Sequence, residues 1–216
     1  MATSRRVIRE AERESSRATI HLLMGIITVV GCYITALLAP NFDLTRVLTV
    51  GLAYVSLIFI ALTLLIGPLR LWQYRRIPLN LDSRRDIGSW AALTSVVHVT
   101  LVFWGRNFGG SIAYFFGQFT WFGAVNYLGL FAAIIILGLL LISNDIALRR
   151  LRGPRWKALQ RFNYLLFAVA VAHTFGFEYF MQRGWGITGL VIALTLVILV
   201  AQAIGFAIYR WRRHTA

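Results

Sequence analysis

Six long apolar segments, separated by short polar connections, organise the chain. Each has close to the roughly 20 residues that a helix needs to cross a hydrocarbon core of about 30 Å. The segments cover residues 20–39, 47–71, 86–104, 126–143, 159–181 and 186–209. Unbroken apolar runs such as LGLFAAIIILGLLLIS at 128–143 indicate helices rather than the alternating strands of a membrane barrel. The pattern predicts an all-α polytopic membrane protein, a bundle of six transmembrane helices.

The composition supports this class and excludes others. Hydrophobic residues make up 58% of the 216 positions and charged residues 14%, against about 45–50% and about 25% in soluble domains. The mean hydropathy is +0.69. These values exclude a soluble globular, a disordered and a secreted disulfide-rich protein. Cys32 is the single cysteine, so the chain has neither an internal disulfide nor a CxxC zinc motif.

The basic residues lie unevenly along the chain, and this predicts its orientation. The net charge is +14, with 22 Lys and Arg residues. All of these except Arg46, Arg106 and Arg183 lie near a terminus, between the second and third segments, or between the fourth and fifth. Because basic residues accumulate on the cytoplasmic side, we expect both termini there. A nucleic-acid partner is not expected, since the basic loops are short and lack interleaved aromatic residues.

The chain divides into three parts. Residues 1–18 mix both charges at helical spacing and predict a short amphipathic segment on the cytoplasmic face. Residues 19–209 form the six-helix membrane domain, and residues 210–216 form a basic cytoplasmic tail. We expect the first apolar segment to be retained rather than cleaved as a signal peptide, because it has full membrane length and several more follow.

Two of the four histidines lie deep inside apolar segments. His98 follows Asp86 by 12 residues and His173 follows Leu159 by 14, which places them about 18 and about 21 Å from the cytoplasmic edge. Both segments run outward, so the two imidazoles reach a similar depth in the outer half of the bilayer. His21 is expected at the interface and His214 in the solvated tail.

Two interpretations of this pair remain open. A histidine in a membrane segment often only donates a hydrogen bond to a neighbouring helix. Two at matched depth could instead be the axial ligands of one haem, each through a neutral imidazole nitrogen, and together form its metal site. A zinc or di-iron site is not expected, because neither segment has a cysteine and no carboxylate lies at ligand spacing.

The residues around both histidines resemble a known family. RRxxGxW…H over 84–98 and RWxxLxxFxYL…H over 155–173 are similar to the ferric reductase-like transmembrane domain. Within it, the likeness is greatest to the haem-binding membrane subunits of periplasmic methionine sulfoxide reductase systems. Many members stack two b-type haems on histidine pairs about 13 or 14 residues apart. Here Arg84 and Gln160 occupy the inner positions, so the resemblance implies one haem b, bound by His98 and His173.

The resemblance also implies electron transfer across a bacterial inner membrane to an acceptor outside the cytoplasm. The chain has no GxGxxG motif and no room for a nucleotide-binding domain, so electrons must come from a separate donor, a flavin (FMN) reductase or the quinol pool. The acceptor is a partner protein or, alternatively, ferric iron or another metal. A rival hypothesis is a haem-free structural subunit that packs in a larger membrane complex.

Three further features carry two interpretations each. Arg106 either pairs with a haem propionate, as part of the cofactor site, or is a simple interfacial arginine. The aromatic connection over 106–126 either caps the haem or forms an interfacial belt. Gly88 allows close approach of a cofactor or of another helix. Glu178 is expected to be a solvated residue at the outer edge.

Overall fold

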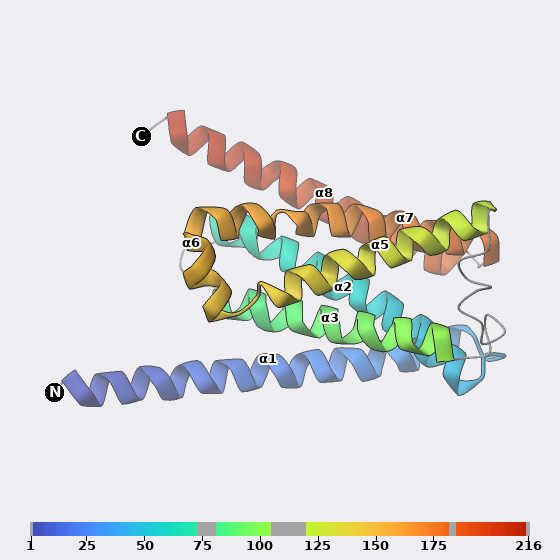
Figure 1. Cartoon of the computed structure of the whole chain (residues 1–216), viewed down its shortest axis with the longest axis horizontal. Coiled ribbons are helices and arrows are strands. Elements are labelled where there is room, and N and C mark those ends of the chain that lie inside the picture. The colour runs from blue at the N-terminus through green and yellow to red at the C-terminus, as the bar shows by residue number, and fades with distance from the viewer. Residues whose placement is uncertain (1, 73–80, 105–119, 182–184, 215–216) are drawn as a thin grey trace.

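The computed structural model describes residues 2–72, 81–104, 120–181 and 185–214. Within these ranges the chain is entirely helical apart from short turns, and the helices lie roughly side by side as a bundle (Figure 1). Both termini lie at one end of it. The seven helices of the described residues are α1 (Ala2–Leu38), α2 (Leu44–Trp72), α3 (Leu81–Trp104), α5 (Trp121–Leu141), α6 (Asp145–Gln160), α7 (Phe162–Met181) and α8 (Trp185–His214).

Five of these helices are long and apolar enough to cross a membrane. They are α2, α3, α5, the part of α1 over Glu14–Leu38 and the part of α8 over Thr188–Arg213. The fifth predicted segment forms α7, a helix of 20 residues that does not join this set. Asn163, His173 and Glu178 interrupt its apolar run. The all-helical membrane fold is confirmed, while six spans stay a prediction.

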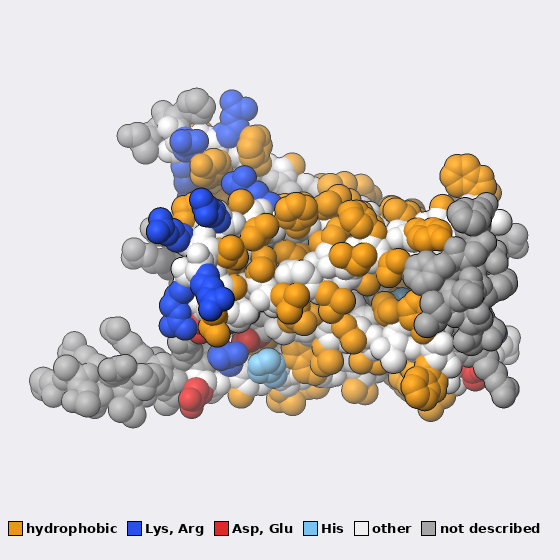
Figure 2. All heavy atoms as spheres, viewed as in Figure 1, with side chains coloured by type: hydrophobic (Ala, Val, Ile, Leu, Met, Phe, Trp, Pro, Cys, Tyr) orange, Lys and Arg blue, Asp and Glu red, His pale blue; other side chains and the backbone are white. Residues whose placement is uncertain are grey.

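Helix α2 is the centre of the bundle. It packs against α1, α3, α7 and α8, and its residue Phe59 is fully buried. The remaining helices expose large apolar side chains such as Val29 on α1 and Leu199 on α8, as expected of surfaces that face lipid. Apolar side chains cover the middle of the bundle, and Lys and Arg gather at the end with both termini (Figure 2). We call this the arginine-rich end.

Near the arginine-rich end, polar contacts join α1 to α3. Arg17 donates two hydrogen bonds to the buried carboxylate of Asp86, at 2.9 and 2.8 Å. Trp90 Nε1 donates to His21 Nδ1 at 2.9 Å. His21 therefore lies at this helix contact, away from His98 and His173. Helix α1 continues without a break from the charged N-terminal residues into the apolar segment.

Helix α6 occupies the basic connection between the fourth and fifth segments, where the apolar pattern predicts no element. Asn144 caps its first turn by accepting a hydrogen bond from the Ala147 N–H at 2.8 Å. At Arg152 the backbone has φ 53° and ψ 151°, so the helix is broken there by a kink. A basic helix with few apolar residues has no hydropathy signal, and the cap was the available clue.

Candidate functional site

A cavity of about 360 Å³ lies between α2, α3, α5 and α7. His98 of α3 and His173 of α7 both line it. The sequence places these residues 75 positions apart, and the bundle brings them to one space. Most of the other lining side chains are apolar, as is usual at sites that bind small organic molecules. The cavity is therefore the candidate site.

Both imidazoles are held in the same way. His98 Nδ1 lies 2.8 Å from the carbonyl oxygen of Thr49 on α2, and His173 Nδ1 lies 2.7 Å from that of Val125 on α5. A carbonyl oxygen only accepts, so each Nδ1 carries the proton. Among the residues that the structure describes, neither ring has another hydrogen bond, which leaves the Nε2 lone pairs for a ligand. The two sequence-based interpretations are thus compatible: each ring bonds a neighbouring helix with one nitrogen and offers the other.

Two glycines let α5 and α7 approach closely enough for this contact. A Cβ at Gly129 would lie 2.8 Å from Nδ1 and 3.1 Å from Nε2 of His173. A Cβ at Gly176 would lie 2.8 Å from Cγ1 of Val125. Real Cβ atoms do not approach so closely, so a side chain at either position would push the ring or the helix away. Phe177 makes a T-shaped contact with the His173 ring, with the two ring centroids 4.9 Å apart.

The same cavity has a few polar side chains. Tyr54 of α2 donates its hydroxyl hydrogen bond to Glu178 of α7, and Arg46 is exposed at the α2 end farthest from the arginine-rich end. Asn126 of α5 is only 1% exposed. Glu178 is 4% exposed, so the expectation of a solvated residue is wrong. The helices bury it because its carboxylate is bonded across to Tyr54.

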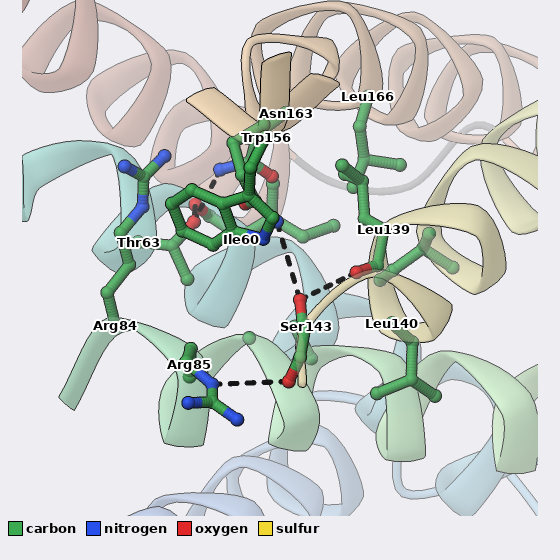
Figure 3. A pocket seen from close by; sticks show the side chains of 14 residues that line it. Ile60, Thr63, Arg84, Arg85, Leu139, Leu140, Ser143, Trp156, Asn163 and Leu166 are labelled. Atoms are coloured by element: carbon green, nitrogen blue, oxygen red, sulfur yellow. Dashed lines mark hydrogen bonds between the residues drawn. The ribbon is translucent and has the colours of Figure 1, made fainter. Parts of the chain in front are cut away.

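A second, much smaller cavity lies toward the arginine-rich end, lined by Arg84, Gly88 and Gln160 (Figure 3). It measures about 40 Å³, room for only a few water molecules. Polar side chains around it already have hydrogen-bond partners: Asn163 Nδ2 donates to Thr63 Oγ1 at 2.6 Å, and Trp156 Nε1 donates to the backbone carbonyl of Ile142 at 2.9 Å.

Of the other residues singled out by the sequence, Phe122 of the aromatic connection lines the large cavity and Gly88 lines the small one. Arg106 and most of the aromatic connection over 106–126 lie outside the described residues. A Cβ at Gly88 would meet Thr63 Cγ2 at 3.9 Å, an ordinary contact between α3 and α2. His214 ends α8 at the arginine-rich end. Sequence reasoning missed Asn126, Gly129, Tyr54 and Arg46, because their roles depend on which helix faces which.

The fold and this cavity define a helical membrane protein in which two histidines line one cavity, each bonded at Nδ1 to a backbone carbonyl. No protein-family model matches the chain. Over 156 residues it is 29% identical to the protein-methionine-sulfoxide reductase heme-binding subunit MsrQ of Azospira oryzae. The match covers 71% of this chain and 63% of that protein, so the chain spans less than two thirds of the length of this relative.

Proposed function

We propose that the chain is a haem-binding membrane subunit that relays electrons through one haem b bound by His98 and His173. The observation that carries the proposal is the shared geometry of these residues. Both line one cavity, both are held at Nδ1 by a backbone carbonyl, and both are thereby fixed as the tautomer that binds iron through Nε2. The likeness to a subunit named for haem binding supports the same conclusion.

The residues present fit such a group in three respects. His98 and His173 come from different helices and line one cavity, so they would hold a haem between α3 and α7. The lining is mostly apolar, which suits the porphyrin faces. The described residues contain no cluster of three or more His, Cys, Asp or Glu that would favour a multi-ligand metal site instead.

When bound, haem supplies reversible one-electron transfer, and the chain supplies the surroundings that make this useful. The carbonyls of Thr49 and Val125 hold the imidazoles in place and raise their basicity through the Nδ1–H bond. The apolar walls of α2, α3, α5 and α7 exclude water from the ligand faces. Because the site lies within the membrane, the electron donor and the electron acceptor can approach it from different sides.

We further propose a separate protein as the acceptor, on the side opposite the arginine-rich end. The relative is a subunit of a methionine sulfoxide reductase by name, so a reductase of that class is the acceptor we propose for this chain. The basic residues at the arginine-rich end favour a cytoplasmic position for this end in a bacterial inner membrane. The donor is then a flavin reductase or quinol from the bilayer.

The small cavity supports one haem rather than two. Arg84 and Gln160 line a space of about 40 Å³ in which neighbouring polar groups already bond one another. A second porphyrin would have to break these bonds and separate the helices.

The test is the absorption spectrum of the purified protein with its histidine variants. The wild type should show a low-spin b-type spectrum after reduction. His98→Ala and His173→Ala should each lose haem or turn high-spin, and His21→Ala should keep the wild-type spectrum. Absence of haem from well-folded wild type would overturn the proposal in favour of a structural subunit. Reduction of ferric iron by the reduced protein without any partner would favour a metal reductase.

A further inference from the structure

Asn126 is a buried amide for which the described protein provides no partner. Its side chain is on α5, 1% exposed, and lines the large cavity. Neither Nδ2 nor Oδ1 has a hydrogen-bond partner among the described residues. Burying an amide without a hydrogen bond costs about 1–3 kcal/mol in proteins. A cavity ligand that bonds this amide would remove that cost.

The position of Asn126 indicates which part of a ligand it meets. It precedes Gly129, the residue under the His173 ring, by three positions, or about one helical turn. Arg46 precedes Thr49, which holds His98, by the same three positions. Both α2 and α5 run toward the arginine-rich end (Figure 1). Asn126 also directly follows Val125, whose carbonyl oxygen bonds His173, so it lies at about the level of the His173 ring. Arg46 lies about one turn beyond Thr49, farther from the arginine-rich end, and both residues line the same cavity.

This pair of side chains has the chemistry of a carboxylate site. The Asn126 amide offers N–H donors in a dry place, and Arg46 offers a guanidinium at the exposed end. Hydrogen bonds to a charged acceptor are stronger than those between neutral groups. The carboxylate of Glu178 is already engaged by Tyr54.

We propose that Asn126 donates a hydrogen bond to a carboxylate at the edge of the cavity ligand, with Arg46 providing the compensating charge. The inference rests on the proposed function: if the ligand is haem b, the carboxylates are its propionates. Contact with Arg46, one turn beyond Thr49, would turn these carboxylates away from the arginine-rich end.

Asn163 provides the matched comparison within the same bundle. It is also a buried asparagine, 7% exposed, but its Nδ2 donates to Thr63 Oγ1 at 2.6 Å and it lines the small cavity. Replacing each by the near-isosteric leucine therefore has opposite consequences. Asn163→Leu breaks an existing bond and leaves Thr63 without this donor. Asn126→Leu removes an amide that the protein leaves unbonded.

The experiment compares iron protoporphyrin IX with its dimethyl ester, which lacks the carboxylates. Each is reconstituted into the full-length detergent-solubilised apoprotein, and its dissociation is followed by transfer to apomyoglobin. The wild type should hold the free acid more tightly than the ester. In Asn126→Leu and Asn126→Ala the free acid should dissociate on the order of tenfold faster, with the ester unchanged. Arg46→Gln should reduce the same preference, and Asn163→Leu should retain it.

Thermal unfolding of the apoproteins is the second measurement. Asn126→Leu should unfold at the same or a higher temperature than wild type, and Asn163→Leu at a lower one. Haem bound normally by wild type with an unchanged acid-to-ester preference in both Asn126 variants would overturn this inference and leave the proposed function standing. A destabilised Asn126→Leu apoprotein would also overturn it, because the amide would then have a structural partner. Failure of wild type to bind either porphyrin would overturn both.

Discussion

Gly129 of α5 lies directly against the imidazole of His173 on α7. A Cβ at residue 129 would lie 2.8 Å from Nδ1 and 3.1 Å from Nε2 of the ring. The ring thus packs directly against the backbone of α5, and the histidine can occupy this position only because residue 129 has no side chain. The same helix carries Gly138, where a Cβ would meet nothing within 4 Å.

This contrast gives the first prediction. Gly129→Ala should push the His173 ring from its place and weaken haem binding about tenfold, the usual scale of overpacking. Gly138→Ala on the same helix should leave haem binding unchanged and slightly favour the helix. Haem content per chain, measured as the pyridine haemochrome, checks both. Equal haem content in the two variants would contradict the assignment of His173 to the site.

The second prediction concerns the number of haems. Wild type should contain one haem per chain, because the cavity at Gln160 is too small for a porphyrin. Gln160→His introduces a histidine side chain there but no additional space, so this variant should still contain one haem. Haem and protein are quantified on the same purified sample. Two haems per chain in wild type would show that the helices separate at Asn163 and Thr63.

The third prediction concerns orientation. Alkaline phosphatase fused after Ala216 should be inactive, since the arginine-rich end is expected in the cytoplasm. The same reporter fused after Asn41, in the connection between α1 and α2, should be active. Activity measured in whole cells distinguishes the two sides. The reverse pattern would mean an inverted protein and would place the two histidines nearer the cytoplasmic surface.

The fourth prediction concerns the contact between α1 and α3. Arg17→Ala leaves the Asp86 carboxylate, 5% exposed, without the two hydrogen bonds that Arg17 donates to it. Because the Arg17 side chain is itself half exposed, we expect a modest loss of about 1–2 kcal/mol in unfolding free energy. The control for loss of charge is Arg149→Ala. Arg149 is exposed on α6 and has no side-chain partner among the described residues. Denaturant unfolding in detergent compares the two alanine variants, and equal stability would mean that the pair contributes nothing.

The sequence was sufficient to predict the helices that hydropathy marks. The segments 47–71 and 186–209 correspond to α2 and α8, with ends displaced by a few residues because helices continue past the apolar core. The sequence was insufficient to predict α6, because this basic segment has no periodic pattern of apolar residues. Hydropathy cannot reveal such a helix, and its Asn144 cap became evident only in the structure.

The site shows a similar division. His98 and His173 stood out because a histidine in an apolar segment is costly, and matched depth suggested that they belong together. The role of Gly129 could not be predicted, because nothing in the sequence distinguishes it from the other glycines of α5. Its role depends on the packing of α7 against it. Burial of Glu178 was missed because it depends on Tyr54, which lies 124 positions away in the chain.

Because backbone carbonyls orient the two histidines, substitutions at the residues that provide them have a particular effect. Thr49 and Val125 act through atoms that every amino acid possesses, so their side chains are irrelevant to the proton on Nδ1. Alanine at either position keeps the carbonyl, so alanine scanning would report only the loss of a buried side chain and overlook this role. Substitutions then affect the protonation of Nδ1 only if they change the spacing of the helices, as a side chain at Gly176 would. Related proteins with other residues at positions 49 and 125 are therefore expected to keep the same arrangement.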